Sequence, residues 1–575
     1  MSEDFTVRAV ITVDGHQLDS QLEPLVESVY VQHDLARPGR FSIALLDPQR
    51  DVIQRAGLQF GSEVVISANP FGRDETFPLI KGEVVSLVGE YNLLGDRAWI
   101  EGYEFSHRLQ RGVHTQSYRN VTDSDLARQI AERAEIQAGT IEESGTTHDH
   151  VSQVNVSDWE FLRMRAHEIG FEVSVVDGKL EFGRPVDSSA GPPEGTLLSA
   201  EPLQLVYGAN LLRFQPRLSS AEQISEVEVR SWDPKQKMAL IGIAPAGTTS
   251  ARLSTDPAEM AARFGNPAFM SGDRPLADQT SVDATAAALA DQIGGSFAEA
   301  EGTARGDPRL RAGSAVSVSG VAAQFAGRYT LSSTDHLIDG EGYRTELVVS
   351  GRQQRSLLSL ASGGAANGDK AATTGRVYGL VVALVTANDD PEGLGRVKMK
   401  FPWLSDAYES DWARMVQLGA GPDSGAVFIP EVNDEVLVGF EFGDVRRPYV
   451  VGGLYNGQDK PRLGEGLFDR GKVKRRGFVS RRGHRVVLFD DDGTSGVAIL
   501  TSDGKLRIAL NETEGEIHIF GDSKVVVEAQ RQLELSSAGD IKLEANGRLT
   551  LEANQGITIR SDGVVDVDGA LIQLN

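Results

Sequence analysis

The sequence predicts a mainly β protein of several domains that ends in an intertwined triple-stranded β-helix. Three observations point to this fold class: strand-like stretches recur over the first 360 residues, five short strands follow within about 80 residues, and the last 60 residues repeat with a period of eight. A chain of 575 residues is too long for one hydrophobic core, so several domains are expected.

The first part of the chain is predicted to hold a strand-rich unit and an α/β insert. Residues 1–115 contain five strand-like stretches, which indicate a first barrel-like unit. In residues 116–200, Thr122 precedes acidic residues as a helix N-cap does, and a second helix is expected over 155–167. The pair Asp177–Gly178 predicts the turn of a hairpin after that helix.

A second strand-rich, barrel-like unit is expected in residues 201–360. The alanine-rich segment 283–301 predicts one helix within it, and further strand-like stretches follow that helix. Residues 361–375 then have the small, polar composition that is typical of a linker between domains.

Residues 376–457 contain five short strands, which favours a small barrel such as the OB-fold. Val397, Met399 and Phe401 alternate with lysines, as in a strand that buries one face. Barrels of this kind can bind oligonucleotides, but the sequence has no stripe of aromatic and basic residues that would support such binding. Residues 458–477 are expected to be a connector to the last domain.

The last domain, residues 478–575, is built on a strict repeat. Apolar–x–apolar triplets recur every eight residues, and each triplet fits a short strand with one buried face. Small residues such as Gly521 and Ser537 lie four positions after the start of each triplet, where a corner is needed. The apolar positions are Ile517, Ile519, Val525, Val527, Leu533, Leu535, Ile541, Leu543, Leu549, Leu551, Ile557, Ile559, Val565 and Val567.

This repeat predicts a shaft made by three chains. One octad cannot bury its own apolar side chains, and eight residues are too few for a single-chain triangular coil, whereas three chains wound about one axis can bury them. A plain antiparallel meander is the alternative, but it does not require an unbroken eight-residue phase. We therefore expect a homotrimer with the apolar positions as its core.

Several segments resemble a known family. Four pieces of the predicted barrel resemble the gp5-like OB domain of VgrG spike proteins, namely Gly395–Trp403, Trp412–Gly421, Ile429–Asp444 and Arg447–Gly457. Three pieces of the N-terminal part resemble the gp27-like half of VgrG and phage tail-hub proteins, namely Ser157–Val173, Gly327–His336 and Gly342–Arg352. The resemblance implies a gp27-like double β-barrel hub with an α/β insert, followed by an OB-fold barrel and a needle.

The resemblance also implies a function. The trimer would be the structural spike of a bacterial contractile injection system, which docks the inner tube and punctures a target envelope on sheath contraction. Implied partners are the inner tube protein, baseplate proteins, a PAAR-like tip protein at Leu574 and Asn575, and effector cargo. Assembly would occur in the bacterial cytoplasm, within a phage tail-like particle that is released or injected.

The subtype of the contractile injection system is inferred from the N-terminal half of the chain. The N-terminal half lacks the aromatic- and arginine-rich stretch expected of a typical type VI secretion VgrG, which favours an extracellular or phage-like system. A type VI secretion VgrG and a phage tail spike carrying cargo are the alternatives. A cell-wall hydrolase and a receptor-binding fibre are further alternatives, which would need a catalytic domain or a terminal globular head.

Composition narrows the function classes. The formal net charge of −25 opposes non-specific binding to nucleic acid or anionic lipid. No apolar run approaches 18 residues, so no stable membrane insertion is expected, and the N-terminus lacks the features of a signal peptide. The absence of cysteine excludes disulfides and fits folding in a reducing compartment.

Enzymatic and metal sites are not expected. About 40 residues separate Gly457 from the first needle strands, and the chain stops on its last strand at Asn575, so neither place holds a catalytic domain. His148 and His150 have metal-like spacing but are expected in a solvated loop, and Asp490–Asp492 is expected to be a hairpin turn rather than a calcium loop. No cofactor is predicted.

A basic cluster precedes the needle. Its functional interpretation is a docking collar for an acidic partner; the alternative is a solvated connector whose charges offset Asp490–Asp492. His518 is expected to face outward from its octad. The residues of the basic cluster are Lys472, Lys474, Arg475, Arg476, Arg481, Arg482 and Arg485.

Overall fold

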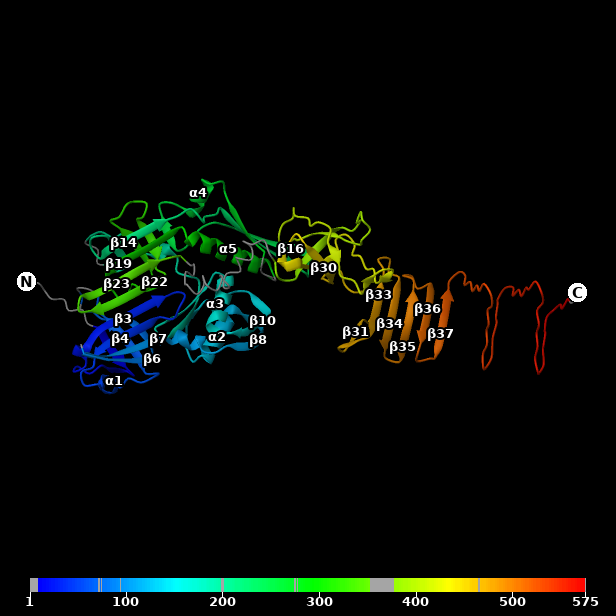
Figure 1. Cartoon of the computed structure of the whole chain (residues 1–575), viewed down its shortest axis with the longest axis horizontal. Coiled ribbons are helices and arrows are strands. Elements are labelled where there is room, and N and C mark those ends of the chain that lie inside the picture. Colours follow the sequence, from blue (N-terminus) through cyan, green and yellow to red (C-terminus); the bar gives the residue numbers. More distant parts are fainter. Residues whose placement is uncertain are drawn as a thin grey trace, which may run out of the picture. The chain divides into compact units, whose positions relative to one another are not determined.

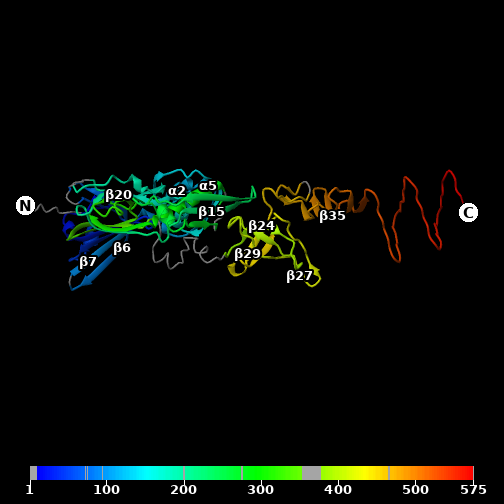
Figure 2. The same ribbon diagram turned by 90° about the horizontal axis from the view of Figure 1, so that it is seen from above.

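The computed structural model describes residues 9–70, 73, 75–93, 95–197, 201–272, 276, 278–351, 377–463 and 466–573 (Figures 1 and 2). The chain divides into two units, Met1–Lys460 and Pro461–Asn575. The predicted linker 361–375 and the predicted tip pair Leu574 and Asn575 lie outside the described residues. Among the residues that are described, no helix is long and apolar enough to cross a membrane.

An 11-stranded sheet dominates the first unit, with the order β14-β19-β23-β22-β3-β4-β7-β6-β5-β1-β2. Strands of the first and second predicted hub units join in it, because β3 and β22 pair antiparallel with His33 opposite Thr334. The strands are β1 (Ala9–Val13), β2 (His16–Gln17), β3 (Val26–Asp34), β4 (Arg40–Leu46), β5 (Glu63–Ala68), β6 (Phe77–Asn92), β7 (Gly95–Glu104), β14 (Leu211–Leu218), β19 (Ala298–Arg305), β22 (Ser333–Asp339) and β23 (Gly342–Val349).

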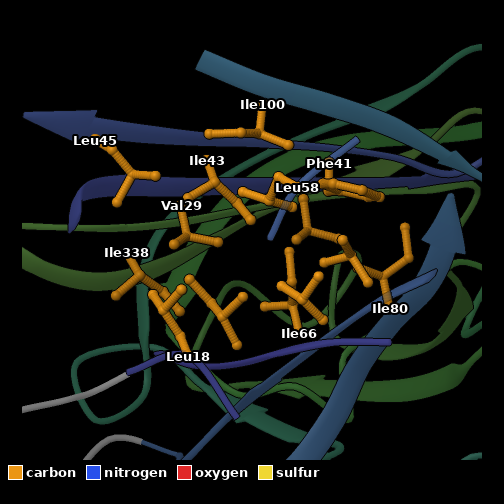
Figure 3. Close-up of a cluster of buried hydrophobic side chains, with 14 of the residues drawn as sticks. Leu18, Val29, Phe41, Ile43, Leu45, Leu58, Ile66, Ile80, Ile100 and Ile338 are labelled. Atoms are coloured by element: carbon orange, nitrogen blue, oxygen red, sulfur yellow. The ribbon is translucent and has the colours of Figure 1, made fainter. Parts of the chain in front are cut away.

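The core of the N-terminal half of this sheet lies on one face, where alternate residues of each strand point inward. Val29, Ile43, Ile66 and Ile100 are all buried and come together from four different strands (Figure 3). Gly102 is needed within this core, because a side chain there would meet the ring of Phe41 at 2.2 Å. A short helix α1 (Val52–Arg55) and the long hairpin of β6 and β7 complete this half (Figure 2).

The predicted α/β insert is present, with both helices close to their expected places. Thr122 and Ser157 each accept a hydrogen bond from the backbone three residues on, forming capping boxes. Asp177 and Gly178 have φ of 49° and 82°, the left-handed turn that the sequence predicted. The elements are β8 (His114–Thr122), α2 (Asp123–Arg133), β9 (Gln137–Ile141), β10 (Thr147–Val156), α3 (Asp158–Glu168), β11 (Glu172–Val176) and β12 (Lys179–Gly183).

The predicted helix 283–301 is wrong at its C-terminal end. The helix α5 spans Gln279–Gly295, and β19 begins at Ala298. Ala298, Ala300 and Ala304 are buried at the two-residue period of a strand, which an alanine-rich composition does not distinguish from a helix. The other elements of this region are β13 (Gln204–Val206), β15 (Glu226–Asp233), β16 (Met238–Pro245), β17 (Ala251–Leu253), α4 (Pro257–Ala262), β18 (Ala268–Ser271), β20 (Ala315–Ser319) and β21 (Gly327–Thr330).

The predicted five-stranded barrel is confirmed, with strand order β25-β24-β29-β30-β26. Val397, Met399 and Phe401 are each 0% exposed, as their alternation predicted. The strands are β24 (Val381–Ala387), β25 (Lys398–Lys400), β26 (Arg414–Met415), β29 (Glu435–Phe440) and β30 (Pro448–Gly453), with a small hairpin of β27 (Ala420–Gly421) and β28 (Ser424–Gly425).

The second unit holds an antiparallel meander of β33 to β37 over residues 475–521 (Figure 1). Only the first predicted triplet, Ile517 and Ile519, lies in a strand of this sheet; the described residues 522–573 form none. The strands are β31 (Phe468–Asp469), β32 (Lys472–Val473), β33 (Arg475–Val479), β34 (Arg485–Asp491), β35 (Thr494–Leu500), β36 (Leu506–Asn511) and β37 (Glu516–Gly521).

Candidate functional site: an apolar ladder and a hub–barrel joint

The meander presents one apolar face that its own chain leaves uncovered. The strand register sets Val486 opposite Ile499 and Ile508 opposite Ile519, so these side chains form a row across four strands. A second row runs beside the first. Its members are Leu488, Val497, Leu510 and Ile517. The side chains of the two rows are 36–69% exposed.

The octads continue this exposure beyond β37. All 14 predicted core side chains are exposed, from 53% for Val565 to 73% for Ile559. Exposed apolar surface of this extent, repeated at a fixed period, is uncommon on a soluble monomer and marks an interaction surface. His518 pairs with Ala509 in the ladder and alternates with Ile517 and Ile519, so it lies on the opposite sheet face, and its outward position in a trimer stays a prediction.

Three residues of the basic cluster lie against the acidic turn of the next hairpin. The Nζ of Lys474 is 2.8 Å from a carboxylate oxygen of Asp492, and Arg475 is 3.1 Å from Asp491. Arg476 pairs with Asp490 at 2.7 Å. Since these three charges are offset within the hairpin, they favour a solvated connector over a docking collar.

The other members of the cluster are not gathered with them. Arg481 and Arg482 lie in the exposed turn between β33 and β34, Lys472 lies in β32, and Arg485 lies in β34. Asp492 and Gly493 form the two-residue turn that joins β34 to β35, as the sequence predicted, with φ of 85° at Gly493.

A joint between the hub and the barrel forms a second candidate site. The indole N–H of Trp232, in β15, donates to Oε1 of Glu435, in β29, at 3.1 Å. The side-chain amide of Asn456 donates to the other oxygen of Glu435 at 2.8 Å. Glu435 is only 3% exposed, and hydrogen bonds to both carboxylate oxygens compensate for the removal of its charge from water.

The tip of the β15–β16 hairpin also fits closely against the turn that follows the barrel. The backbone N–H of Gly457 donates to the carbonyl of Pro234 at 2.7 Å. A side chain at Gly457 would lie 1.8 Å from the carbonyl oxygen of Lys235, so only glycine allows this approach. Lys237, which has φ of 56°, forms an ion pair with Asp459.

Sequence reasoning missed this joint. The dipeptide Asn456–Gly457 ends one of the segments that resemble the VgrG barrel, and it was the one local signal. Trp232 and Glu435 lie 203 residues apart, and nothing in either local pattern indicates that they meet.

The predicted solvated loop at His148 is wrong. His148 and His150 lie in β10. Nε2 of His148 is 3.0 Å from one carboxylate oxygen of Asp123, and the other oxygen accepts from Nε of Arg165 at 2.7 Å. Burial raises the pKa of Asp123, but the hydrogen bonds from His148 and Arg165 outweigh burial and hold that pKa below its usual value. Among the described residues, no group of three or more histidine or acidic side chains is placed to hold a metal ion.

Two family models match the chain. One, described as the Alg8 N-terminal domain, covers residues 3–340. The other, described as the type VI secretion system/phage-baseplate injector OB domain, covers residues 381–455 and therefore coincides with the five-stranded barrel.

Curated relatives match over shorter segments. The type VI secretion system spike protein VgrG2a of Pseudomonas aeruginosa is 38% identical over 123 residues, which is 20% of this chain and 14% of that protein. The spike protein VgrG3 of Vibrio cholerae is 36% identical over 89 residues, 14% of this chain and 9% of that protein. The matches thus span a small part of these relatives.

Among solved structures, the 43 kDa tail protein of prophage MuSo2 from Shewanella oneidensis aligns with a TM-score of 0.43 at 14% identity, covering 60% of this chain and 98% of that chain. The E. coli c3393 protein, titled a component of the type VI secretion system, aligns with a TM-score of 0.38 at 14% identity, covering 77% and 99%.

Proposed function

The chain belongs to the family of the Alg8 N-terminal domain, and from this membership and the injector-type barrel that follows we propose that three copies form the central spike of a bacterial contractile injection system. The relatives that match part of the chain are spike proteins by name, which supports a structural role rather than an enzymatic one. The assignment of each domain follows from this proposal.

The observation that carries the proposal is the uncovered apolar ladder. Each of its 14 octad side chains is more than half exposed, and the first triplet, Ile517 and Ile519, belongs to the two rows of the meander. Burying a valine, leucine or isoleucine side chain contributes about 1.5–3 kcal/mol, so covering this ladder is strongly favoured. Three copies around one axis would cover all three ladders at once, because each chain supplies the neighbours that the other two lack.

The other domains would have the following roles. Residues 1–115 and 201–360 would form the hub that seats the inner tube, with the insert 116–200 between them. Residues 376–457 would form a collar, and 458–477 a connector to the needle 478–575. The joint of Trp232 with Glu435 would transmit load between hub and collar, because its hydrogen bonds are buried and satisfied.

Partners and location are part of the same proposal. The hub would contact the inner tube protein and baseplate proteins, and the needle end would take a PAAR-like tip protein and effector cargo. The spike would assemble in the bacterial cytoplasm within a phage tail-like particle. An extracellular or phage-like system is the preferred setting; the names of the curated relatives favour a type VI secretion system as the second candidate.

A substitution pair in one octad tests the trimer. Leu551→Asp would place three carboxylates at the axis, whereas Thr550→Asp adds the same charge at the adjacent outward position. We expect native mass spectrometry of the full chain to give trimers for the wild type and Thr550→Asp and a loss of trimer for Leu551→Asp. Trimers in all three, or a monomeric wild type, would contradict the three-chain shaft.

The role as a spike is tested separately on assembled particles. A tag placed after Asn575 and decorated with gold should label one end of purified particles, on the particle axis. Label at the periphery would indicate a receptor-binding fibre instead. Clearing of cell-wall material by the purified chain in a zymogram would indicate a hydrolase and contradict the structural role.

A further inference from the structure

One strand pairing joins the two halves of the 11-stranded sheet. In the strand order, β22 is the last strand from residues 211–349, and its neighbour β3 is the first strand from residues 9–104. Six residue pairs make up this ladder, from Ser333 opposite Asp34 to Ile338 opposite Val29. The cohesion of the hub sheet across this pairing, which we call the seam, therefore depends on what lies directly beneath it.

A buried histidine lies beneath the seam on β22. His336 is 0% exposed, and both of its ring nitrogens are already in use. Nε2 donates to the carbonyl of Leu310 at 2.9 Å, which leaves Nδ1 to accept from the hydroxyls of Tyr343 at 2.9 Å and Thr345 at 3.2 Å. These contacts suit the neutral imidazole, and they offer a second ring proton only the uncharged hydroxyl oxygens of Tyr343 and Thr345.

A second histidine packs against the first from β3. The rings of His33 and His336 meet edge to face, with centroids 5.7 Å apart. Nε2 of His33 is buried without a hydrogen-bond partner. Burial, followed by the charge of Arg311, lowers the pKa of His33 to about 3, although a hydrogen bond with the Leu79 backbone acts in the opposite direction. Burial and the neighbouring His33 also hold the pKa of His336 well below its usual value.

One charged group acts on both histidines, and it repels a proton rather than attracting one. Arg311 acts on both histidines and is held in place by Asp177, 3.2 Å away, and by the carbonyl of Pro78. Asp335 lies on the opposite face of the sheet, because it alternates with His336 along β22.

Among the described residues, none of the other charged groups on the surrounding elements forms an ion pair with either histidine. Asp34 accepts from the backbone of Ala36, and Asp307 pairs with Arg309. The remaining groups lie on the opposite sheet face or pair elsewhere; they are Arg40, Lys81, Asp339, Arg344 and Glu346.

We propose that the seam is an acid-sensitive joint, at which protonation of His33 and His336 separates the two halves of the hub sheet. An imidazolium at His336 would be fully buried, one at His33 would also be opposed by the charge of Arg311, and no described carboxylate pairs with either ring. The protonated rings are accommodated only when β3 and β22 part and water enters.

The direction of the effect follows from linkage. The folded pKa values lie below the unfolded value of about 6.5, so the open state binds more protons than the closed state. The stabilising contribution of the neutral pair is therefore fully present above pH 6.5 and is lost progressively as the pH falls below it. Each histidine lowers the closing equilibrium about tenfold per pH unit in that range.

Hydrogen exchange of the full-length chain tests this proposal. Peptides covering β3 and β22 are compared with peptides covering β29 of the barrel from pH 7.5 to 4.5, after correction for intrinsic exchange rates. We expect protection of the seam peptides to fall at least tenfold per pH unit below 6.5 relative to β29. Seam protection that keeps a constant ratio to that of β29 would overturn the proposal without any variant.

The variant His33→Gln isolates one of the two protons. Glutamine is uncharged at every pH and can donate to the Leu79 carbonyl. For each pH unit below 6.5, the loss of protection in the variant should therefore be about tenfold smaller than in the wild type. His16→Gln, which changes an exposed histidine on β2, should follow the wild type. A His33→Gln chain that follows the wild-type course would also overturn the proposal.

Discussion

Trp232 of the hub donates its indole N–H to a carboxylate of the barrel, Glu435, at 3.1 Å, across 203 residues of sequence. The same carboxylate accepts from Asn456, just after the last barrel strand. One buried charge thus binds a hub hairpin, a barrel strand and the chain that leaves the barrel. This side chain joins three segments of the hub–barrel joint, beside the contacts of Gly457 with Pro234 and of Lys237 with Asp459.

Trp232→Phe tests this joint. The variant keeps an aromatic ring but removes the donor to a buried carboxylate, so we expect it to lower the free energy of unfolding by about 1.5–3 kcal/mol. Urea denaturation of the full chain, followed through barrel peptides in hydrogen exchange, measures the loss. Trp412→Phe is the matched control, since that barrel ring packs against Lys398 instead. Equal losses in the two variants would contradict the role of the Trp232 hydrogen bond.

Gly457→Ala tests the close approach of the hairpin. The added methyl would lie 1.8 Å from the carbonyl oxygen of Lys235, so the two segments must move apart. Overpacking of this kind costs about 1–3 kcal/mol, and we expect faster proteolysis between barrel and hub. Gly453→Ala adds the same methyl where nothing lies within 4 Å, and it should cleave like the wild type. Similar cleavage rates for both variants would count against the joint.

The sequence predicted elements whose signals are local. Val397, Met399 and Phe401 alternate within one strand and are all fully buried, and Thr122 caps the helix that it precedes. The turn at Asp177–Gly178 depends on two adjacent residues that tolerate left-handed backbone, so it too could be predicted.

Contacts between distant segments could not be predicted in the same way. The pairing of His33 with Thr334 joins strands about 300 residues apart, and neither strand carries a pattern that specifies its neighbour. His148 lies among serine, threonine and glycine residues that are typical of loops, yet it lies in a strand, with Nε2 3.0 Å from a carboxylate oxygen of the buried Asp123. The cover of the octad ladder is likewise a property of several chains and not of one.

The contribution of Glu104 to the stability of the fold is expected to depend on pH with a sign opposite to that of His33, and Glu104→Gln tests this. Burial raises the pKa of Glu104 to about 7, although Ser106 donates to it at 2.7 Å. A raised folded pKa means that the native state binds more protons, so this contribution is present below about pH 4.5 and is lost as the pH rises through about 7.

The measurement is the urea midpoint of Glu104→Gln and wild type from pH 5.5 to 8.5. Because glutamine does not ionise, the variant should gain stability relative to the wild type as the pH rises from 5.5 to about 7, and the difference should then stay constant up to pH 8.5. Glu101→Gln, which changes an exposed residue of the same strand, is the matched control. A constant difference for Glu104→Gln from pH 5.5 to 8.5 would contradict the buried carboxyl.

Asp123→Asn tests the ion network of the insert. Asp123 is 0% exposed and accepts from Arg165 at 2.7 Å and from His148 at 3.0 Å, so the amide would leave the Arg165 guanidinium without its principal buried counter-charge. Breaking a buried pair in this way costs about 3–5 kcal/mol. Asp149→Asn, at an exposed neighbouring position in β10, should cost less than about 0.5 kcal/mol.

Because the folded pKa of Asp123 is lowered, the cost of Asp123→Asn should be complete above about pH 4 and should shrink as the pH falls further. Urea midpoints at pH 7 and pH 3 measure both effects, and a loss at pH 7 no larger than that of Asp149→Asn would show that the network does not hold the insert together.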